Sequence, residues 1–299
     1  MVPKAWELRE TAIHSMSTTR IRNIAITCIR TASDPQITPY VELSGKQLKN
    51  RLNPKDALVI LESLNVLRFA LESGVKLVSV LVDARHLERL LEQLPQLGEG
   101  DTPIYYAQRE VLSAIAGIDV TRGYLACAKR PHPLGMDELL SLARRIVVLE
   151  GLTDVSNVGA IFRSCVALGA DGIVLSPECA DPLNRRAIRV SMGTVLRLPW
   201  TRAERPWPKS SLAVLRERGF RTVALTLGED ASPIDAVAGE LGADERVALV
   251  LGSEGWGLSR AVLDACDSKA TITMAEGIDS LNVATASALA CWEFFAKRR

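Results

Sequence analysis

The fold of this chain is indicated by residues 247–255, VALVLGSEG. The apolar run from Val247 to Leu251 has no polar alternation, which is the pattern of a strand buried on both faces of a parallel sheet. Gly252 and Gly255 then break the strand, and a helical pattern follows at residues 258–265. A strand that ends in a small polar turn before a helix is the repeating element of an α/β sheet, and ligands bind at such turns.

The same alternation extends over the second half of the chain. Six strands are predicted, at residues 146–149, 172–175, 195–198, 221–225, 246–251 and 270–274. Five helices are predicted, at residues 157–168, 182–191, 212–218, 258–265 and 281–296. We therefore expect residues 145–299 to form a parallel α/β domain.

The first half contains a shorter version of this pattern. Strands are predicted at 57–61, 75–82, 104–107 and 123–128, and helices at 63–72, 84–94 and 109–116. We expect residues 51–130 to form a small α/β domain with a mainly parallel sheet. Pro131 and Pro133 continue neither element, so residues 131–144 are predicted to be a linker.

Residues 1–50 differ from the rest of the chain. They lack strong periodicity, with some structure expected near residues 21–30. Up to Arg51 there are eight Lys or Arg residues against four acidic ones. We expect a basic extension, which either contacts phosphate or is a solvated tail.

The overall composition excludes several classes of protein. The net charge of the 299-residue chain is only +1, which predicts no global field for nucleic acid. There is neither a signal-peptide pattern at the start nor an apolar run of transmembrane length. The six cysteines form no CxxC pair, which favours reduced thiols in a cytoplasmic protein.

The common cofactor and catalytic motifs are absent from the sequence. No GxGxxG follows a strand and no Gly-Lys-Ser/Thr occurs, which argues against a Rossmann dinucleotide site and a P-loop. A GxSxG nucleophile elbow is missing. The three histidines are scattered, so no metal site is predicted.

Three polar segments at strand ends hold the candidate functional residues. The first, residues 154–163, reads DVSNVGAIFR. Asn157 is a candidate cap of the helix that contains Arg163. An arginine in the apolar run AIFRSC is costly unless it is paired with a carboxylate or faces a ligand, and the sequence leaves both possibilities open.

The second and third segments are LGSEGWGLSR (251–260) and DSLNVAT (279–285). Glu254 is expected either to pair with Arg163 or to accept hydrogen bonds from backbone amides. Asp279 or Ser280 can cap the last helix. Asn282 is a poor helix former in what would be the first turn, which predicts a polar task for it.

A cluster of arginines lies outside these segments. Arg185 and Arg189 are four residues apart on one predicted helix face, with Arg186 between them. Together with Arg197, Arg202 and Arg205, they make the best candidates for phosphate contacts outside the N-terminus. A solvated helix face is the alternative.

Taken together, the three segments resemble the three motifs of the SpoU (TrmH-like) branch of SPOUT RNA methyltransferases. NVGAIFRS is similar to the first motif, LVLGSEGWGLS to the second and ITMAEGIDSLNVATA to the third, in the right order and spacing. The resemblance covers residues 145–299. Residues 55–130 resemble, more loosely, the small substrate-binding domain that often precedes this catalytic domain.

The resemblance implies a parallel α/β sheet whose C-terminal stretch forms a deep trefoil knot that binds S-adenosylmethionine. Its contacts would come largely from loop backbone groups. The corresponding positions here are Thr226, Leu227, Gly228, Gly252, Ser253, Gly255, Ile272, Met274, Leu281 and Asn282. Gly252, Ile272 and Leu281 are the strongest of these candidates.

The reaction implied by the resemblance is methyl transfer to a ribose 2′-hydroxyl of RNA. Arg163 corresponds to the catalytic arginine, and Asn157, Glu254, Ser280 and Asn282 would hold it and the ribose. A guanidinium barely deprotonates, so Arg163 either positions the ribose or acts as a base with help from an RNA phosphate. The family is dimeric, with Arg163 of one chain facing the cofactor of the other.

Several alternatives remain open at this stage. Ribosomal RNA is favoured over transfer RNA because a separate N-terminal domain accompanies many relatives that act on rRNA. A base methyltransferase of the wider knotted superfamily and a non-catalytic RNA-binding protein are the minority interpretations. Trp256 departs from the small or polar residues frequent at its position in relatives, and packing at the dimer interface is favoured over stacking on a base.

Overall fold

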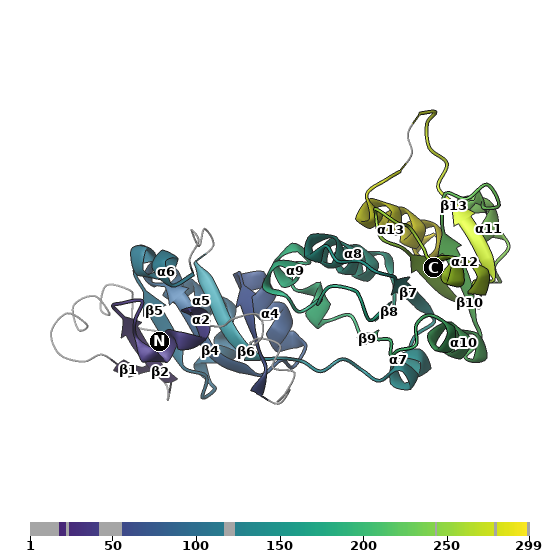
Figure 1. The fold of residues 1–299 in the computed structure, drawn as a ribbon. Coiled ribbons are helices and arrows are strands. Elements are labelled where there is room, and N and C mark those ends of the chain that lie inside the picture. Colours follow the sequence, from purple (N-terminus) through teal and green to yellow (C-terminus); the bar gives the residue numbers. More distant parts are fainter. Residues whose placement is uncertain are drawn as a thin grey trace. The chain divides into compact units, whose positions relative to one another are not determined.

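The computed structural model describes residues 18–21, 24–41, 56–116, 123–242, 244–277 and 280–297. The chain divides into two compact units, Met1–Pro131 and His132–Arg299, which are described separately below (Figure 1). The predicted linker at 131–144 is not entirely irregular, because residues 136–142 form a helix that belongs to the second unit.

The first unit is built on one six-stranded sheet. Its strands, in the order β1-β2-β5-β4-β6-β3, are β1 (Thr18–Ile21), β2 (Ile24–Ile29), β5 (Ile104–Ala107), β4 (Leu77–Asp83), β6 (Tyr124–Lys129) and β3 (Leu58–Glu62). Its longer helices are α4 (Leu64–Glu72), α5 (Leu87–Gln93) and α6 (Arg109–Ala116). The expectation of a mainly parallel sheet is wrong, because β6 runs antiparallel to both β3 and β4, and β1 is antiparallel to β2. Strand–helix alternation predicts the elements but not the direction of each pairing.

Part of the predicted basic extension belongs to this sheet. β1 and β2 lie at its edge, and β2 pairs in parallel with β5. The short helix α2 (Thr38–Val41) places Tyr40 in the core, where its hydroxyl is 3.0 Å from the Ser79 carbonyl oxygen and accepts from the Cys127 amide at 3.1 Å. Residues 24–41 are therefore structural, whereas residues 1–17 and 42–55 lie outside the described residues.

The second unit has a seven-stranded sheet in which every neighbouring pair is parallel, as predicted. In the order β11-β13-β10-β12-β7-β8-β9, the strands are β11 (Ser232–Pro233), β13 (Ser268–Thr271), β10 (Phe220–Leu225), β12 (Arg246–Leu251), β7 (Arg145–Leu149), β8 (Gly172–Leu175) and β9 (Trp200–Arg202). Strand β12 contains the apolar run VALVL and begins one residue before it, at Arg246. Val247 to Leu251 are all buried.

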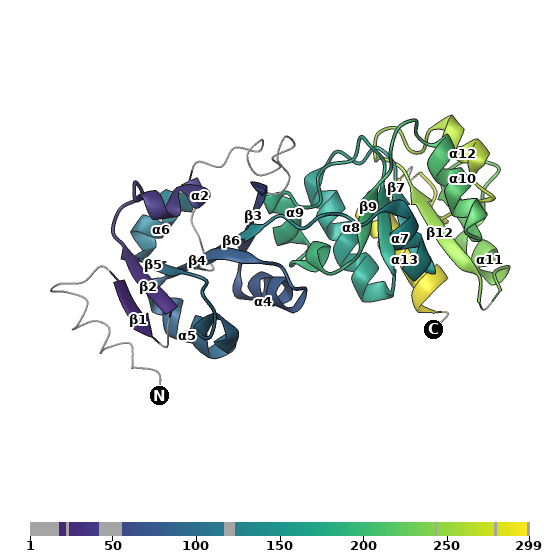
Figure 2. The ribbon, with the colours of Figure 1, turned by 90° about the horizontal axis from the view of Figure 1, so that it is seen from below.

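Helices cover both faces of this sheet (Figures 1 and 2). On one face, α7 (Met136–Leu142), α10 (Lys209–Glu217) and α12 (Arg260–Ala265) pack onto the strands in one apolar core. On the other, α8 (Val155–Leu168) packs between α9 (Arg185–Val190) and α13 (Val283–Cys291), and α13 continues as the π-helix η6 (Trp292–Ala296). The remaining helix, α11 (Ile234–Gly239), contacts β13 and η6.

One predicted strand is wrong. Residues 195–198 do not extend: Thr194–Leu196 form the 3₁₀ turn η5, and the strand comes later as β9. Gly193 at φ +87° turns the chain at this point, and the apolar run is buried in the 3₁₀ turn. A short buried run cannot be assigned to a strand by its apolar character alone.

The order of the strands brings the three polar segments together. The chain moves outward from β7 through β8 to β9, and later returns so that β12 lies between β7 and β10. The loops after β7 and β12 therefore meet at the topological switch point, beside the loops after β10 and β13. In a parallel sheet this edge is where ligands bind.

Neither a transmembrane helix nor a metal cluster is found in the described part of the chain. Among these residues no helix combines the length and apolarity that crossing a bilayer requires. The same residues contain no group of three or more His, Cys, Asp or Glu side chains that could hold a metal ion. All six cysteines are free thiols.

Candidate active site

A cavity of about 480 Å³ opens at the carboxyl ends of β10, β12 and β13. This volume lies within the range of small-molecule sites. Nine of the ten predicted cofactor positions line it: Thr226, Leu227, Gly228, Gly252, Ser253, Gly255, Ile272, Met274 and Leu281. Asn282 does not line it, although its neighbours Leu281 and Val283 do. Apolar side chains and loop backbone make up most of the wall, which fits a cofactor with an adenine ring and an aliphatic sulfonium arm.

Gly252 is required by the tight turn that follows β12. A Cβ atom built on Gly252 would lie 2.2 Å from the carbonyl of Gly257. The turn is closed by the Gly257 amide, which donates to the Ser253 carbonyl at 2.9 Å. Gly255 differs, because a Cβ there would meet nothing within 4 Å. Close backbone approach therefore accounts for the glycine at 252 but not for the one at 255.

A second cavity, of about 360 Å³, lies beside the first. It is lined by the loop after β7, the start of α8 and the same turn after β12. Its residues are Gly151, Leu152, Thr153, Asp154, Asn157, Ser253, Glu254, Gly255, Trp256 and Val283. Ser253 to Trp256 and Val283 belong to both cavities, so these residues form the wall between them.

Three predicted catalytic residues meet in a hydrogen-bonded cluster at this wall. The Asn282 side-chain amide donates to Glu254 Oε1 at 2.5 Å and to Asn157 Oδ1 at 3.1 Å. The Val283 amide also donates to Glu254 Oε1, at 3.3 Å. Asn157, Glu254 and Asn282 come from the three different segments, so the fold brings together residues up to 125 positions apart.

The caps of the two helices differ from the sequence-based expectation. Asn282, not Ser280, caps α13, since its Oδ1 accepts from the amides of Ala284 and Thr285. Ser280 instead lines the larger cavity, and Asp279 lies outside the described residues. Asp154 caps α8, which places Asn157 one turn further along and leaves its side-chain oxygen for Asn282.

Asp154 is held in its charged form by the helix it caps. Its Oδ1 accepts from the amides of Asn157 at 3.0 Å and Ser156 at 2.5 Å. These two hydrogen bonds, with a smaller contribution from the charge of Arg186, lower the pKa of the Asp154 carboxyl below its ordinary value. A charged carboxylate is therefore fixed on the wall of the second cavity.

Arg163 is exposed on α8 and makes no described contact with this cluster. No described residue hydrogen-bonds or ion-pairs with it, and it lines neither cavity. An intramolecular pair with Glu254 is not formed, because the described partners of Glu254 are Asn282 and Val283. Of the two possibilities left by the sequence, internal pairing is excluded within the described residues, and a position facing a ligand or another subunit remains.

The three arginines of the phosphate hypothesis lie on α9, where Arg186 and Arg189 are exposed and Arg185 is half-buried. Helix α9 lies very close to α8: a Cβ on Gly159 would be 2.7 Å from the Ala187 carbonyl oxygen.

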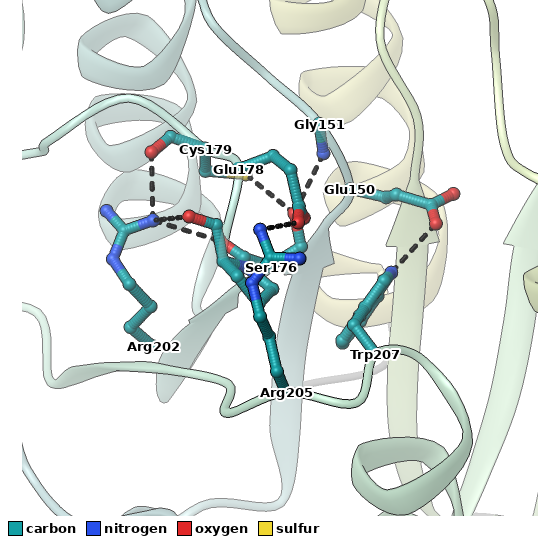
Figure 3. Close-up of polar contacts among 9 residues, drawn as sticks. Glu150, Gly151, Ser176, Glu178, Cys179, Arg202, Arg205 and Trp207 are labelled. Atoms are coloured by element: carbon teal, nitrogen blue, oxygen red, sulfur yellow. Dashed lines mark hydrogen bonds and ion pairs between the residues drawn. The ribbon is translucent and has the colours of Figure 1, made fainter.

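Arg202, another arginine of the phosphate hypothesis, has a structural role instead. It donates to the carbonyls of Ser176 at 2.9 Å and Cys179 at 2.8 Å, which locks the loop after β8 (Figure 3).

Glu150, at the end of β7, is a site residue that sequence reasoning missed. Its Oε1 accepts from Trp207 Nε1 at 2.8 Å (Figure 3). Oε1 also accepts from the Ser259 hydroxyl at 2.8 Å, and Oε2 accepts from the Ser259 amide at 2.7 Å. Ser259 caps α12 directly after the turn at 252–257. Glu150 thus anchors the end of that turn to the central strand. An acidic residue directly after a buried strand was the available signal.

Comparison with known proteins identifies the family. Residues 144–292 match the sequence model of the SpoU rRNA Methylase family. An uncharacterized tRNA/rRNA methyltransferase of Mycobacterium bovis is 38% identical over 261 residues, 87% of this chain and 88% of its own length. The chain belongs to the SpoU family. A 23S rRNA (adenosine(1067)-2′-O)-methyltransferase of Streptomyces azureus is a more distant SpoU relative, 28% identical over 89% of this chain and 94% of its own length.

Solved structures support the SpoU fold. The AdoMet-bound rRNA methyltransferase from Sinorhizobium meliloti is 23% identical, with a TM-score of 0.72 over 90% of this chain and 97% of that one. The SpoU family carries out S-adenosylmethionine-dependent ribose methylation. The chain is therefore an RNA methyltransferase that uses this cofactor, as expected from the three motifs. Whether its C-terminal segment is knotted stays a prediction.

Proposed function

We propose that this enzyme transfers a methyl group from S-adenosylmethionine to a ribose 2′-hydroxyl of ribosomal RNA. The observation that supports this most is the Asn157–Glu254–Asn282 cluster, which stands on the wall between two adjoining cavities. One cavity has the size and lining for the cofactor, and the other opens beside it with the polar side chains of Asp154, Asn157 and Glu254 in its wall. The similarity to the Streptomyces azureus 23S rRNA enzyme favours rRNA over tRNA.

In this proposal the larger cavity holds the cofactor, which when bound supplies an electrophilic methyl group. Gly252, Ile272 and Leu281 contribute backbone and apolar contacts, and the other predicted cofactor residues complete the wall. Asn282 acts on the opposite side of this wall. It holds Glu254 and Asn157 in one orientation, so that their remaining acceptor sites can position the ribose.

The remaining catalytic roles concern Arg163 and Ser280. Ser280 is exposed at the cavity lining, where its hydroxyl can bind the ribose or Arg163. Arg163 stays protonated, so it positions the ribose and stabilises the oxygen as the 2′-hydroxyl proton is lost. An RNA phosphate is the group that could accept this proton.

We propose that the working molecule is a homodimer in which Arg163 of one copy completes the site of the other. The unpaired, exposed position of Arg163 on α8 supports this. A second support is the outer face of the C-terminal helix, where Leu289 is 44% and Trp292 51% exposed. Large apolar side chains grouped on one face are typical of an interaction surface.

The RNA contacts outside the site are assigned to Arg185, Arg186 and Arg189 and to the first unit. The α9 arginines would contact phosphates and set the register of the RNA rather than its sequence. No metal is needed for methyl transfer in this scheme. An rRNA substrate also implies a cytoplasmic location.

Incubation with tritiated S-adenosylmethionine and unmethylated total RNA tests the proposal. We expect label in rRNA that is recovered in alkali-resistant dinucleotides, because a 2′-O-methyl group blocks alkaline cleavage at that ribose. Label in tRNA would correct the substrate class. Label that remains on bases after the dinucleotides are separated would contradict ribose methylation, and no label despite cofactor binding would favour a protein that only binds RNA.

A further inference from the structure

Trp256 occupies an unusual position for a tryptophan. It lies in the turn after β12 and is 95% exposed. Large aromatic side chains are normally buried for most of their surface, so such exposure indicates a binding role. Trp256 is also one of the residues that line both cavities.

The turn that presents Trp256 is rigid. Ser253 and Gly257 form an isolated β-bridge around it, and the Gly257 amide donates to the Ser253 carbonyl at 2.9 Å. Gly252 packs against Gly257 with no room for a side chain, and Ser259 is fixed by Glu150 just beyond. The backbone that carries Trp256 is therefore held in place, so only the side-chain torsions of the indole have to be ordered when a flat ligand stacks on it.

Within one copy of the chain, the lining of the second cavity favours an uncharged polar group over a phosphate. Among the described residues that line it there are two acids, Asp154 and Glu254, and no lysine or arginine. The Asp154 carboxylate is kept charged by the amides at the start of α8. Negative charge would repel a phosphate, whereas a nucleobase presents a flat, uncharged face and several hydrogen-bonding groups.

We propose that Trp256 stacks on the base of the target nucleotide, with that base in the second cavity and its ribose at the Asn157–Glu254–Asn282 cluster. This inference rests on the proposed function. An enzyme that acts on a ribose inside folded RNA must hold the nucleotide out of its stack, and aromatic side chains stabilise such bases. The assignment differs from the sequence-based preference for packing at the dimer interface, because Trp256 lines both cavities.

Three substitutions separate stacking from apolar packing. Trp256→Phe keeps an aromatic face, and Trp256→Leu keeps apolar volume without one. Leu142→Ala is the matched control, since Leu142 is an exposed apolar residue, 69% accessible, that lines neither cavity. Each full-length variant is titrated with in vitro transcribed 23S and 16S rRNA in separate experiments. KM and kcat for methyl transfer, the Kd for S-adenosylmethionine and the mass by light scattering are also measured.

We expect Trp256→Leu to raise the Kd and KM for RNA about tenfold, as loss of one stacked base does. Trp256→Phe should stay within about threefold of the wild type, and Leu142→Ala should be unchanged. The Kd for the cofactor and the mass should be unchanged in all three. If the wild type binds RNA but labels neither rRNA, the proposed function fails while the RNA dissociation constants still decide the role of Trp256.

Other results would overturn the inference. Equal RNA binding by Trp256→Leu and the wild type, or no RNA binding by either, would exclude stacking on the substrate. A weakened Kd for S-adenosylmethionine alone would assign Trp256 to the cofactor site. Loss of the dimer in Trp256→Leu would return the residue to the subunit interface.

Discussion

Arg163 and the polar cluster show two different states of a predicted catalytic side chain. Asn157, Glu254 and Asn282 hydrogen-bond to one another, so their orientation is set before any ligand binds. Arg163 is exposed and has no partner among the described residues. Because no described contact depends on the Arg163 side chain, its replacement should cost little folding stability. A loss of activity in such a variant would then report on the reaction and not on folding.

Arg163→Ala should lower kcat by about 10²- to 10³-fold, as removal of one group that stabilises a developing oxyanion does. RNA binding, cofactor binding and the free energy of unfolding should hardly change. Arg163→Lys should restore only part of the rate, because an ammonium lacks the planar fork. Arg218→Ala, which removes an exposed ion pair with Asp137, is the control. A parallel loss of rate in the control would exclude a specific role for Arg163.

The capping carboxyl of Asp154 should make the stability of the protein depend on pH. Its folded-state pKa is lowered by the two amides it caps, so its stabilisation is complete above the ordinary carboxyl pKa and lost as pH falls through the lowered value. Asp154→Ala should cost about 1 kcal/mol at pH 7 and less at acidic pH, where the wild-type carboxyl becomes protonated. Asp154→Asn keeps a capping oxygen without a titratable charge, so its loss relative to the wild type should be smaller and should also shrink as the pH falls. Urea unfolding at neutral and at acidic pH measures this, and a constant loss in Asp154→Ala would contradict it.

At the scale of the structural elements, contacts between the loops at the strand ends hold the site together. The loops after β7 and β12 meet at the switch point of the sheet. Glu150 joins them through Ser259, and Arg202 ties the loop after β8 to β9 (Figure 3). Gly159 lets α8 and α9 approach closely enough to set the position of the arginine-bearing helix.

Glu150→Gln should weaken cofactor binding several-fold and lower the free energy of unfolding by about 1–3 kcal/mol. A glutamine keeps one acceptor, but its NH₂ group would face either the Ser259 amide or the Trp207 Nε1 donor, so at least one hydrogen bond to the charged carboxylate is lost. Glu178→Gln is the matched control: its ion pair with Arg205 is exposed, and loss of such a pair costs at most about 1 kcal/mol. Calorimetry and urea unfolding measure both quantities. Equal effects in the two variants would show that Glu150 has no special role.

Gly159→Ala should destabilise the protein by about 1–2 kcal/mol. The gain in helix propensity is outweighed by overpacking, because the new Cβ would lie 2.7 Å from a backbone oxygen of α9. Gly239→Ala, at the end of α11, meets nothing within 4 Å and should be neutral or slightly stabilising. Thermal unfolding compares the two. Equal midpoints would mean that α8 and α9 are not in close contact.

The whole molecule is expected to act as a dimer formed around the C-terminal helix. Replacement of both Leu289 and Trp292 by Glu should yield a monomer that has lost methyl transfer, since Arg163 can then no longer reach a second site. Leu142→Glu changes a leucine on α7 that is still more exposed, and it should leave the mass unchanged. Light scattering with a tritium transfer assay tests this. A fully active monomer would show that the site is complete within one chain.

The sequence determined the alternation of strands and helices in the second half, the parallel sheet and the family. Local apolar runs and turn residues encode these features over a few positions, and the spacing of three motifs is specific. Asn157, Glu254 and Asn282 could be named because they stand in those motifs.

The tertiary structure decided what depends on residues far apart in the chain. Pairing geometry, not alternation, made the first sheet mixed and placed β1 and β2 in it. Which residue caps a helix, and that Glu254 binds Asn282 instead of Arg163, follow from backbone positions that no local pattern contains. The contact of Glu150 with Ser259 and the position of Trp256 beside two cavities exist only because the loops after β7 and β12 lie at one edge of the sheet. Contacts across more than a hundred residues depend on strand order, which no local pattern contains.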